Sequence, residues 1–322
     1  MTKKPLSIEI IFKGYRPKPL NNYANRWNSK CVFDENHTDG SGQKSFYFDA
    51  EENWYHCFSC KESGSFSSLL NKMGVSAFDI LELVNFSFES VEDVRVDKSP
   101  NKIILPIKTS EYYLGRGFSS KLLKRFKIVQ ESVTLKSGDR VVEHIIPSIQ
   151  NNLVVGYEAF YLLPSGIKER RTSDGYQKSE YLYNFNPELE EAFMVEGPAD
   201  TLRLTSYGED VISTWGTNLS EKQVQIIKES KLKTLILCAD NDLAGFLANE
   251  LWYRQLNNVV DCKFIFYPSE DPDKCSLFDW ELAQETICDY LTYSITMYDL
   301  YGDDYEAVVT QAEKLWRKRK YN

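Results

Sequence analysis

The feature of this sequence that most restricts its fold is a regular alternation of short apolar runs and helical segments in the C-terminal half. The apolar runs are AFMVEG, DVISTWG, KTLILCAD and CKFIFYP, and the first three are each followed by a segment of helical pattern, such as PADTLRLTSYG. Strands that alternate with helices of about 10–15 residues indicate a parallel sheet with right-handed crossovers. The sequence therefore predicts a parallel α/β sheet over residues 188–282.

Acidic residues follow three of the predicted strands at the points where those strands end. In an open parallel sheet, ligands bind outside the carboxyl ends of the strands, where side chains from several loops can meet. A group of carboxylates is stable there only when cations neutralise it, and such oxygen ligands select Mg²⁺ or Mn²⁺. Acidic residues at helix starts also serve as caps, but their recurrence from strand to strand favours a metal site. The six candidates are Glu196, Asp200, Asp240, Asp242, Asp271 and Asp273.

The N-terminal part of the chain carries a second set of potential metal ligands. Cys31 and His37 form a C-x5-H pair, and Cys57 and Cys60 form a C-x2-C pair. Thiolates and an imidazole with C-x2-C spacing predict a tetrahedral structural Zn²⁺ site. Asp34 is the alternative second ligand, and we favour His37 because imidazole suits zinc better than a carboxylate does. Four residues that bind no metal are the remaining interpretation.

Charge is segregated along the chain, whose formal net charge is −9. Residues 98–187 carry 14 Lys and Arg against 8 Asp and Glu, whereas residues 188–322 carry 13 against 25. Phosphate contacts depend on a local basic face rather than on the total charge, so a nucleic-acid partner is compatible with this acidic chain. The acidic part requires its own explanation, and bound cations supply one.

The sequence contains no sign of a membrane segment or a disulfide framework. No apolar run reaches the ~18 residues that a membrane-spanning helix needs. The N-terminal MTKKPLSIEIIFKG lacks the pattern of a signal peptide, and we interpret it as a first strand. The seven cysteines are an odd number without dense spacing, which indicates a reducing, cytoplasmic compartment.

Several segments closely resemble those of the DnaG-type DNA primases. MVEGPADTLRL and LILCADNDLAG resemble the Glu-Gly and Asp-x-Asp motifs of the TOPRIM domain, while WGTNLS and EDPDK resemble two further segments of that domain. YHCFSC resembles the second half of the family's zinc-binding domain, although C-x5-H replaces the commoner C-x2-H in the first half. The resemblance covers about residues 28–282 in the family's order, and the compact size resembles a bacteriophage version.

The resemblance implies a multidomain chain of α/β and α+β parts. Its expected parts are a zinc-binding ribbon domain (1–74), an acidic helix and linker (75–101), a mixed basic subdomain that opens an RNA-polymerase domain (102–187), a TOPRIM domain with a parallel α/β sheet (188–282), and a helical C-terminal tail (283–322).

The resemblance also implies an activity. DnaG-type primases are DNA-directed RNA polymerases that make short RNA primers on single-stranded DNA from ribonucleoside triphosphates, for DNA replication. The six acidic candidates would be catalytic, and all of them except Asp200 would hold Mg²⁺ or Mn²⁺. Further implied features are a structural Zn²⁺, a replicative helicase acting in trans, no membrane association, and the cytoplasm of a phage-infected bacterium. The alternatives are a TOPRIM-type nuclease and a non-catalytic, zinc-dependent module that binds single-stranded DNA.

Basic residues between the two metal sites are implied to hold template and nucleotide phosphates. KSEYLYNF and YYLGRGFSSKLLKRFKI resemble family segments that carry such residues, which points to Lys178 and Arg116. Arg170 and Arg171 are candidates without an aligned motif, and GYEAFYLL lacks the Gly-Arg that the family usually has at this point. Aromatic residues of the zinc-binding domain either stack on template bases or form its core; these are Phe46, Phe48, Trp54 and Phe58.

Overall fold

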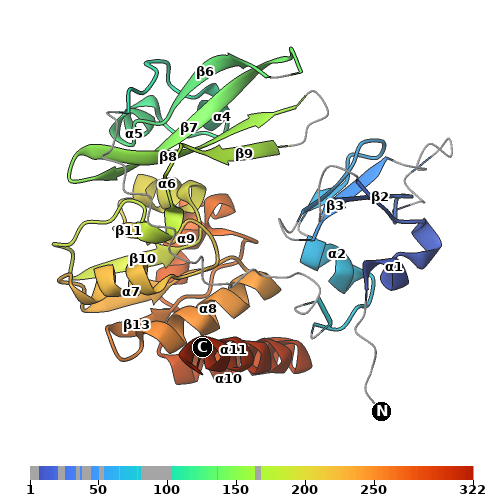
Figure 1. Cartoon of the computed structure of the whole chain (residues 1–322). Coiled ribbons are helices and arrows are strands. Elements are labelled where there is room, and N and C mark those ends of the chain that lie inside the picture. The colour runs from blue at the N-terminus through green and yellow to red at the C-terminus, as the bar shows by residue number, and fades with distance from the viewer. Residues whose placement is uncertain are drawn as a thin grey trace. The chain divides into compact units, whose positions relative to one another are not determined.

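The computed structural model of the chain describes residues 7–20, 26–33, 37, 45–50, 54–64, 66–77, 79–80, 103–135, 137–163 and 168–321 (Figure 1). The chain forms two compact units, one of residues 1–89, 242–250 and 294–322 and the other of residues 90–241 and 251–293. Asp34 and the predicted linker at 85–101 lie outside the described residues.

The first unit contains a five-stranded antiparallel sheet in the order β1-β2-β3-β4-β5. Its strands are β1 (Lys18–Pro19), β2 (Arg26–Ser29), β3 (Phe46–Asp49), β4 (Trp54–Cys57) and β5 (Ser63–Gly64). Helix α2 (Phe66–Lys72) follows the sheet. The ring of Phe48 stacks on Phe12 and on Phe66, with centroid distances of 4.5 and 4.8 Å. Stacked aromatic rings therefore form this small core, where aliphatic side chains are few.

The prediction of an N-terminal strand is wrong for the described residues. Ile8–Ile11 form the short helix α1, and Lys13–Tyr15 form the 3-10 helix η1. The carbonyl of Ser7 accepts hydrogen bonds from the amides of Ile10 and Ile11, which closes one helical turn. This turn precedes Phe12, whose side chain is fully buried in the aromatic core.

The first unit also contains helix α11 (Asp303–Tyr321) and parts of two other helices. Helix α8 (Leu243–Leu256) begins in this unit, and α10 (Tyr290–Tyr301) ends in it. Helices α10 and α11 lie in the predicted helical tail at 283–322. The Tyr305 hydroxyl donates a hydrogen bond to the fully buried Glu250 carboxylate. Phe246 and Tyr301 pack with ring centroids 4.9 Å apart. None of the helices in the described part of the chain combines the length and the hydropathy needed to cross a membrane.

The second unit contains an antiparallel sheet in the order β6-β7-β8-β9. These strands are β6 (Val129–Thr134), β7 (Arg140–Gln150), β8 (Leu153–Leu162) and β9 (Lys168–Thr172). Two short helices precede them, α4 (Glu111–Gly115) and α5 (Ser120–Arg125), and the 3-10 helix η3 (Lys178–Glu180) follows. Apolar side chains of α4, α5 and the sheet share one core with Leu202 and Trp215 of the next part of the chain. The antiparallel sheet is therefore packed against helix α6 and the segment that follows β11.

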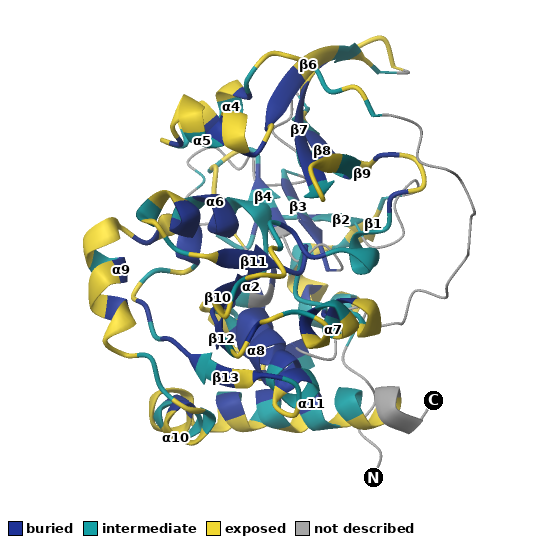
Figure 2. Ribbon diagram, turned by 90° about the vertical axis from the view of Figure 1, so that its left-hand side faces the viewer, coloured by how far each residue is buried: buried dark blue, intermediate teal, exposed yellow. Residues whose placement is uncertain are grey.

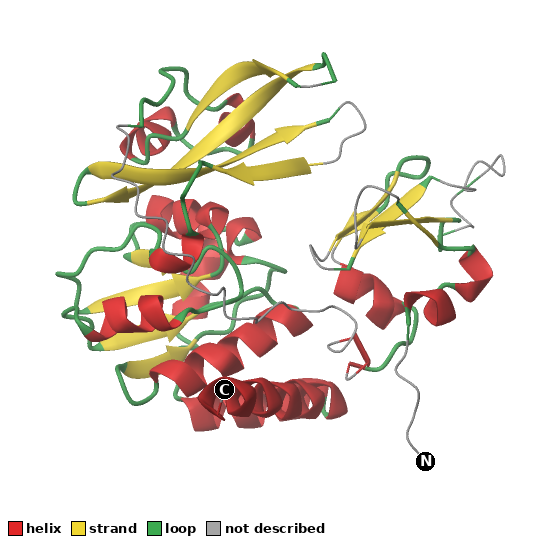
Figure 3. Cartoon of the chain, viewed as in Figure 1, coloured by secondary structure: helices red, strands yellow, loops and turns green. Residues whose placement is uncertain are grey.

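The parallel sheet over residues 188–282 is confirmed, and all its strand pairs are parallel in the order β11-β10-β12-β13 (Figure 3). Its elements are β10 (Glu191–Val195), α6 (Pro198–Tyr207), β11 (Val211–Ser213), α7 (Glu221–Lys228), β12 (Thr234–Leu237), β13 (Asp261–Phe264), η4 (Pro272–Lys274) and α9 (Leu277–Gln284). On one face, Phe193 packs with Leu204 of α6 and Trp280 of α9. On the other face, Met194 and Leu235 are fully buried as well, as a parallel sheet requires (Figure 2).

Candidate functional site

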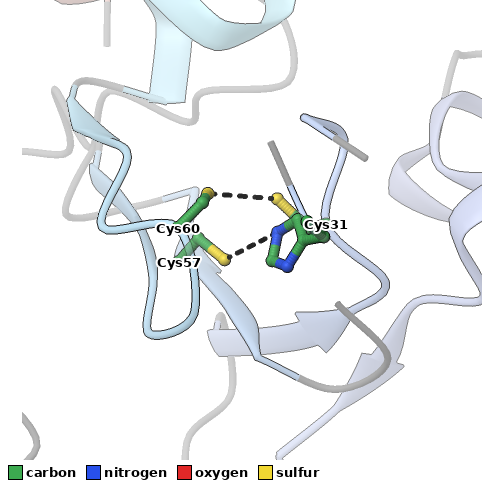
Figure 4. Close-up of side chains that lie close together, drawn as sticks. Cys31, Cys57 and Cys60 are labelled. Carbon is green, nitrogen blue, oxygen red and sulfur yellow. Dashed lines mark hydrogen bonds between the residues drawn. The ribbon is translucent and has the colours of Figure 1, made fainter. Parts of the chain in front are cut away.

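The four predicted zinc ligands lie together beside the antiparallel sheet of the first unit. Cys31 follows β2, Cys57 ends β4, Cys60 lies in the turn after β4, and His37 lies in the loop between β2 and β3. One ligand atom from each of these residues lies within 4.8 Å of the other three. Figure 4 shows the sulfur of Cys60 facing that of Cys31, and the sulfur of Cys57 facing the imidazole.

The separations within this group fit one tetrahedral zinc ion. The Zn–S and Zn–N distances of such sites imply about 3.8 Å between two sulfurs and about 3.6 Å between a sulfur and a nitrogen. The Sγ atoms of Cys31 and Cys60 are 3.8 Å apart, and Cys57 Sγ lies 3.6 Å from His37 Nε2. The Phe33 amide also donates a hydrogen bond to Cys31 Sγ at 3.3 Å, and such donors stabilise metal-bound thiolates.

The two faces of the N-terminal sheet separate the aromatic candidates. Phe46 and Phe48 are fully buried, so they belong to the core. On the opposite face Tyr47 pairs with His56 across the strands, and Phe58 packs edge-on against both rings at centroid distances of 5.2 and 4.5 Å. His56 therefore points away from the predicted zinc ligands, although it is next to Cys57 in the sequence. Of the four aromatic candidates, Phe58 is the one whose described side chain lies with this partly exposed group.

Glu196 and Asp240 meet at the carboxyl end of the parallel sheet. They follow the neighbouring strands β10 and β12, whose register pairs Met194 with Leu237. The Asp240 amide donates a hydrogen bond to Glu196 Oε1 at 3.1 Å. The Glu196 carboxylate is thus held beside the backbone of Asp240.

Asp200 lies in the first turn of α6, close to the same edge. The Gly197 amide donates a hydrogen bond to its Oδ2 at 3.1 Å. Burial, followed by the negative charge of Asp271, raises the pKa of Asp200 to about 7. Burial and the charges of Asp200 and Asp240 also raise the pKa of the Cys238 thiol, at the end of β12, well above its usual range. Glu196, Asp200, Asp240 and Asp271 therefore form one electronegative edge of the parallel sheet, which we call the acidic edge.

Asp242 and Asp271 both act as helix caps in this structure. Asp242 Oδ1 accepts hydrogen bonds from the amides of Ala244 and Gly245, at 2.9 and 3.0 Å, at the start of α8. Asp271 caps η4, since its Oδ1 accepts from the Lys274 amide at 2.9 Å, and its Oδ2 lies 2.9 Å from Lys274 Nζ. Capping is the role that the sequence offered as the alternative to metal binding.

Asp273 is held by two arginines. Its buried carboxylate pairs with Arg116, which follows α4, and lies 3.6 Å from the Arg203 guanidinium of α6. Arg203 also donates to the backbone carbonyls of Asp273 and Arg116, at 2.9 and 3.1 Å. Arg116 thus connects the basic subdomain to the acidic edge.

Among the described residues, the Cys31 group is the only set of three or more His, Cys, Asp or Glu side chains that lie close enough together to bind one metal ion. Magnesium binding at the acidic edge therefore stays a prediction.

The pleat of β9 separates the two adjacent arginine candidates. Arg170 pairs in register with Phe160 of β8, and Arg171 pairs with Ala159. Side chains of neighbouring strand residues point to opposite faces, so the two guanidinium groups cannot share a site. Arg171 instead forms a bidentate pair with the buried Glu143 of β7.

The remaining basic candidates gather around Glu158 of β8. Lys178 Nζ donates to Glu158 Oε2, and the Arg170 guanidinium lies 3.7 Å from Oε1. Lys168 shares the face of Arg170, and its Nζ lies 3.8 Å from the centroid of the Phe160 ring. Burial, followed by the positive charge of Arg170, lowers the pKa of Lys168 to about 7. We refer to Arg116, Lys168, Arg170 and Lys178 as the basic cluster.

Sequence reasoning did not select three side chains that organise these sites. Lys168 was detectable, because the period of two in a strand places it on the same face as Arg170. Arg203 lies three residues after Asp200 on the same helix, which was a weaker signal. Glu158 had no sequence signal beyond being a carboxylate within a basic segment.

Known proteins resemble this chain in sequence and in fold. Residues 193–276 match a family model described as Toprim-like. The chain is 27% identical over 330 aligned positions to a DNA primase of Legionella pneumophila, covering 83% of this chain and 56% of the relative. A DNA primase of Buchnera aphidicola is 24% identical over 325 positions, covering 79% and 55%. The chain thus spans about half the length of these curated relatives.

A solved structure has the same fold. The crystal structure of an Aquifex aeolicus primase, comprising its zinc-binding and RNA-polymerase domains, matches 96% of this chain and 89% of its own with a TM-score of 0.50. The sequences are 16% identical, so this likeness concerns the fold.

The parallel sheet and its acidic edge define a Toprim-like domain, here combined with a Cys/His metal site and a basic antiparallel subdomain. The chain is thus similar in sequence to DNA primases, and its fold matches that of a primase comprising zinc-binding and RNA-polymerase domains.

Proposed function

We propose that this protein is a DNA primase that synthesises short RNA primers on single-stranded DNA. The observation that carries the proposal is the joining of the acidic edge and the basic cluster within one compact unit by the Arg116–Asp273 pair. A polymerase needs both elements next to each other, because phosphates must be held where the reacting oxygen is activated.

The proposed reaction is nucleotidyl transfer. The 3′-hydroxyl of the growing primer attacks the α-phosphate of a ribonucleoside triphosphate, the new phosphodiester bond forms, and pyrophosphate leaves. Glu196, fixed by the Asp240 amide, would help to accept the hydroxyl proton. The basic cluster would hold the phosphates of the nucleotide and of the template. Divalent cations, when bound, supply charge neutralisation at the reacting phosphate.

The proposed ligands of those cations are Glu196, Asp240, Asp242, Asp271 and Asp273, with Mg²⁺ or Mn²⁺ as the metal. Carboxylate oxygens suit these hard cations. Asp273 can bind a cation only if Arg116 and Arg203 release its carboxylate. We expect that release when a cation and a phosphate bind together. Asp200, buried beside Asp271, would support the site without contacting the substrate.

The test is a synthesis assay with single-stranded template, four ribonucleotides and Mg²⁺. RNA products that disappear in Asp240→Asn but persist in Asp261→Asn support the proposal. Asp261 is a suitable control because it is exposed and lies at the opposite end of the same sheet, where β13 begins. Template cleavage would instead indicate a nuclease, and binding without reaction would indicate a DNA-binding module.

The zinc-binding part would choose where priming starts. Its outward group of Tyr47, His56 and Phe58 offers rings on which template bases can stack. A replicative helicase in trans remains the proposed protein partner. The bacteriophage origin and the cytoplasmic location stay predictions.

A further inference from the structure

The basic cluster contains a carboxylate of its own. Glu158 is 4% exposed, and each of its two oxygens faces a different cation, Lys178 at Oε2 and Arg170 at Oε1. Both cations reach the surface, with side chains 31% and 53% exposed, so a ligand can approach them. Glu158 therefore lies on the buried side of Lys178 and Arg170, and a phosphate would contact these two residues from their exposed side.

Lys168 differs from these two cations. It forms no ion pair with a carboxylate of any described residue and lies over the rings of Phe160 and Tyr112, at 3.8 and 5.5 Å from their centroids. A largely buried ammonium group without an anionic partner is costly, and a bound phosphate would remove that cost. The cluster thus combines one cation that forms no ion pair with a described carboxylate and two cations that share the single carboxylate of Glu158.

We propose that Glu158 is an internal competitor of the phosphate-bearing ligand and sets the affinity of the basic cluster for it. A carboxylate and a phosphate oxygen accept the same hydrogen bonds from ammonium and guanidinium groups. A bound phosphate must therefore share Lys178 and Arg170 with Glu158, whereas Lys168 forms no ion pair with Glu158. The consequence is binding that is weak enough to be released after each nucleotide addition, which a polymerase that moves along its template requires.

This inference rests on the proposed function, but its test is a binding measurement that does not depend on primer synthesis. Inorganic tripolyphosphate, the anionic part of a nucleoside triphosphate, serves as the probe, and binding is measured calorimetrically at several salt concentrations. Synthesis is not part of the readout. Failure of the primer assay would overturn the proposed function alone, and failure of the binding assay would overturn the role of Glu158 alone.

The decisive variant is Glu158→Gln, which keeps the shape of the side chain and removes its charge. We expect tripolyphosphate to bind about tenfold more tightly, roughly 1.4 kcal/mol, with a log–log salt dependence that is steeper by about one. Glu131→Gln on strand β6 makes the same charge change at an exposed position and should bind like the wild type. A folded Glu158→Gln protein that binds no more tightly than Glu131→Gln would overturn the proposal, since Glu158 would then merely orient its partners.

A second comparison leaves Glu158 in place, in case its substitution prevents folding. If Glu158 competes for Arg170, then Arg170→Gln should weaken tripolyphosphate binding less than Lys168→Met does, by a factor of about three or more. Coulomb's law alone would favour the reverse order, because guanidinium groups are always charged in proteins, whereas the pKa of Lys168 is lowered to about 7. An equal or larger loss in Arg170→Gln would contradict the competition.

Discussion

The two candidate metal sites differ in how far the protein assembles them. The four ligand atoms of the Cys31 group already lie within 4.8 Å of one another. At the acidic edge, by contrast, the carboxylates form hydrogen bonds and ion pairs that stabilise the fold. Glu196 accepts from a backbone amide, Asp271 caps η4, and Asp273 pairs with arginines.

The difference follows from the chemistry of the ligands. A thiol is a weak hydrogen-bond partner, so a cysteine cluster has few competing contacts within the protein. A carboxylate accepts strong hydrogen bonds from amides and guanidinium groups, so it is used elsewhere until a cation competes for it. A structural site can therefore be recognised from gathered ligands, whereas a catalytic edge shows only which carboxylates are near each other.

The largest effect is expected at the preassembled site. Cys57→Ser should abolish zinc binding, which can supply roughly 10 kcal/mol of folding free energy in such sites. We expect loss of the zinc by elemental analysis and rapid proteolysis confined to the N-terminal 80 residues. Extension of a pre-annealed primer should persist, while initiation at preferred template sites should be lost.

The matched control for that variant is Cys262→Ser, which changes a buried thiol of the parallel sheet that lies outside the metal group. It should retain one zinc per chain. Full zinc occupancy in Cys57→Ser would contradict the ligand assignment, and initiation at the same template sites would contradict the proposed division of labour.

Asp240 and Asp273 should separate catalysis from stability at the acidic edge. Asp273→Asn leaves two arginines facing a neutral group, and loss of such charge-assisted hydrogen bonds costs roughly 2–3 kcal/mol of unfolding free energy. Asp240→Asn should cost less than about 1 kcal/mol yet abolish synthesis. Denaturant unfolding and the synthesis assay measure the two quantities. A similar loss of unfolding free energy in both variants would contradict the assignment of Asp273 to stability and Asp240 to catalysis.

Asp200→Asn should stabilise the protein when divalent cations are absent. Burial raises the folded-state pKa of Asp200 to about 7, above the ordinary value of 3.8. The wild type therefore loses stability as the pH rises from about 4 through 7, and the asparagine variant does not. At pH 8 we expect a gain of roughly 2–4 kcal/mol. A stability difference that is independent of pH would contradict the assigned cause.

The smallest effect is expected at Lys168. Its folded-state pKa of about 7 means that sulfate, an anion that does not itself titrate, should bind a few times more weakly at pH 8 than at pH 6.5. Lys168→Met should remove this dependence, as measured by NMR titration. The charged and titratable groups that face Lys168 are Arg116 and Tyr112 near α4, Glu158 of β8, Arg170 of β9 and His144 of β7.

His144 must be separated from Lys168 in that experiment. Burial, followed by the charge of Lys168, lowers the pKa of His144 below 6.5, so it titrates on the acid side of the chosen window. His144→Gln should therefore keep the pH dependence. A flat profile in His144→Gln would assign the effect to the imidazole instead.

The sequence predicted what depends on local spacing. The strands that precede Glu196 and Asp240 form where the period of their segments indicated, and the four predicted zinc ligands lie close together. It did not predict contacts between distant segments, such as the Arg116–Asp273 pair across 157 positions. Nor did it show which face of β9 each arginine occupies, because a run of charged residues carries no apolar pattern to identify the buried side.

That run of charges raises the question of what fixes the register of β9. The strand reads KERRT, lies at the edge of its sheet, and has polar side chains on both faces, so burial of apolar groups cannot decide its pairing. Two buried carboxylates on opposite faces decide it instead. Glu158 meets Arg170 and Glu143 meets Arg171, and a slip by one residue would break both ion pairs at once. The same charges make the edge unattractive to other strands, so they also protect the protein from aggregation.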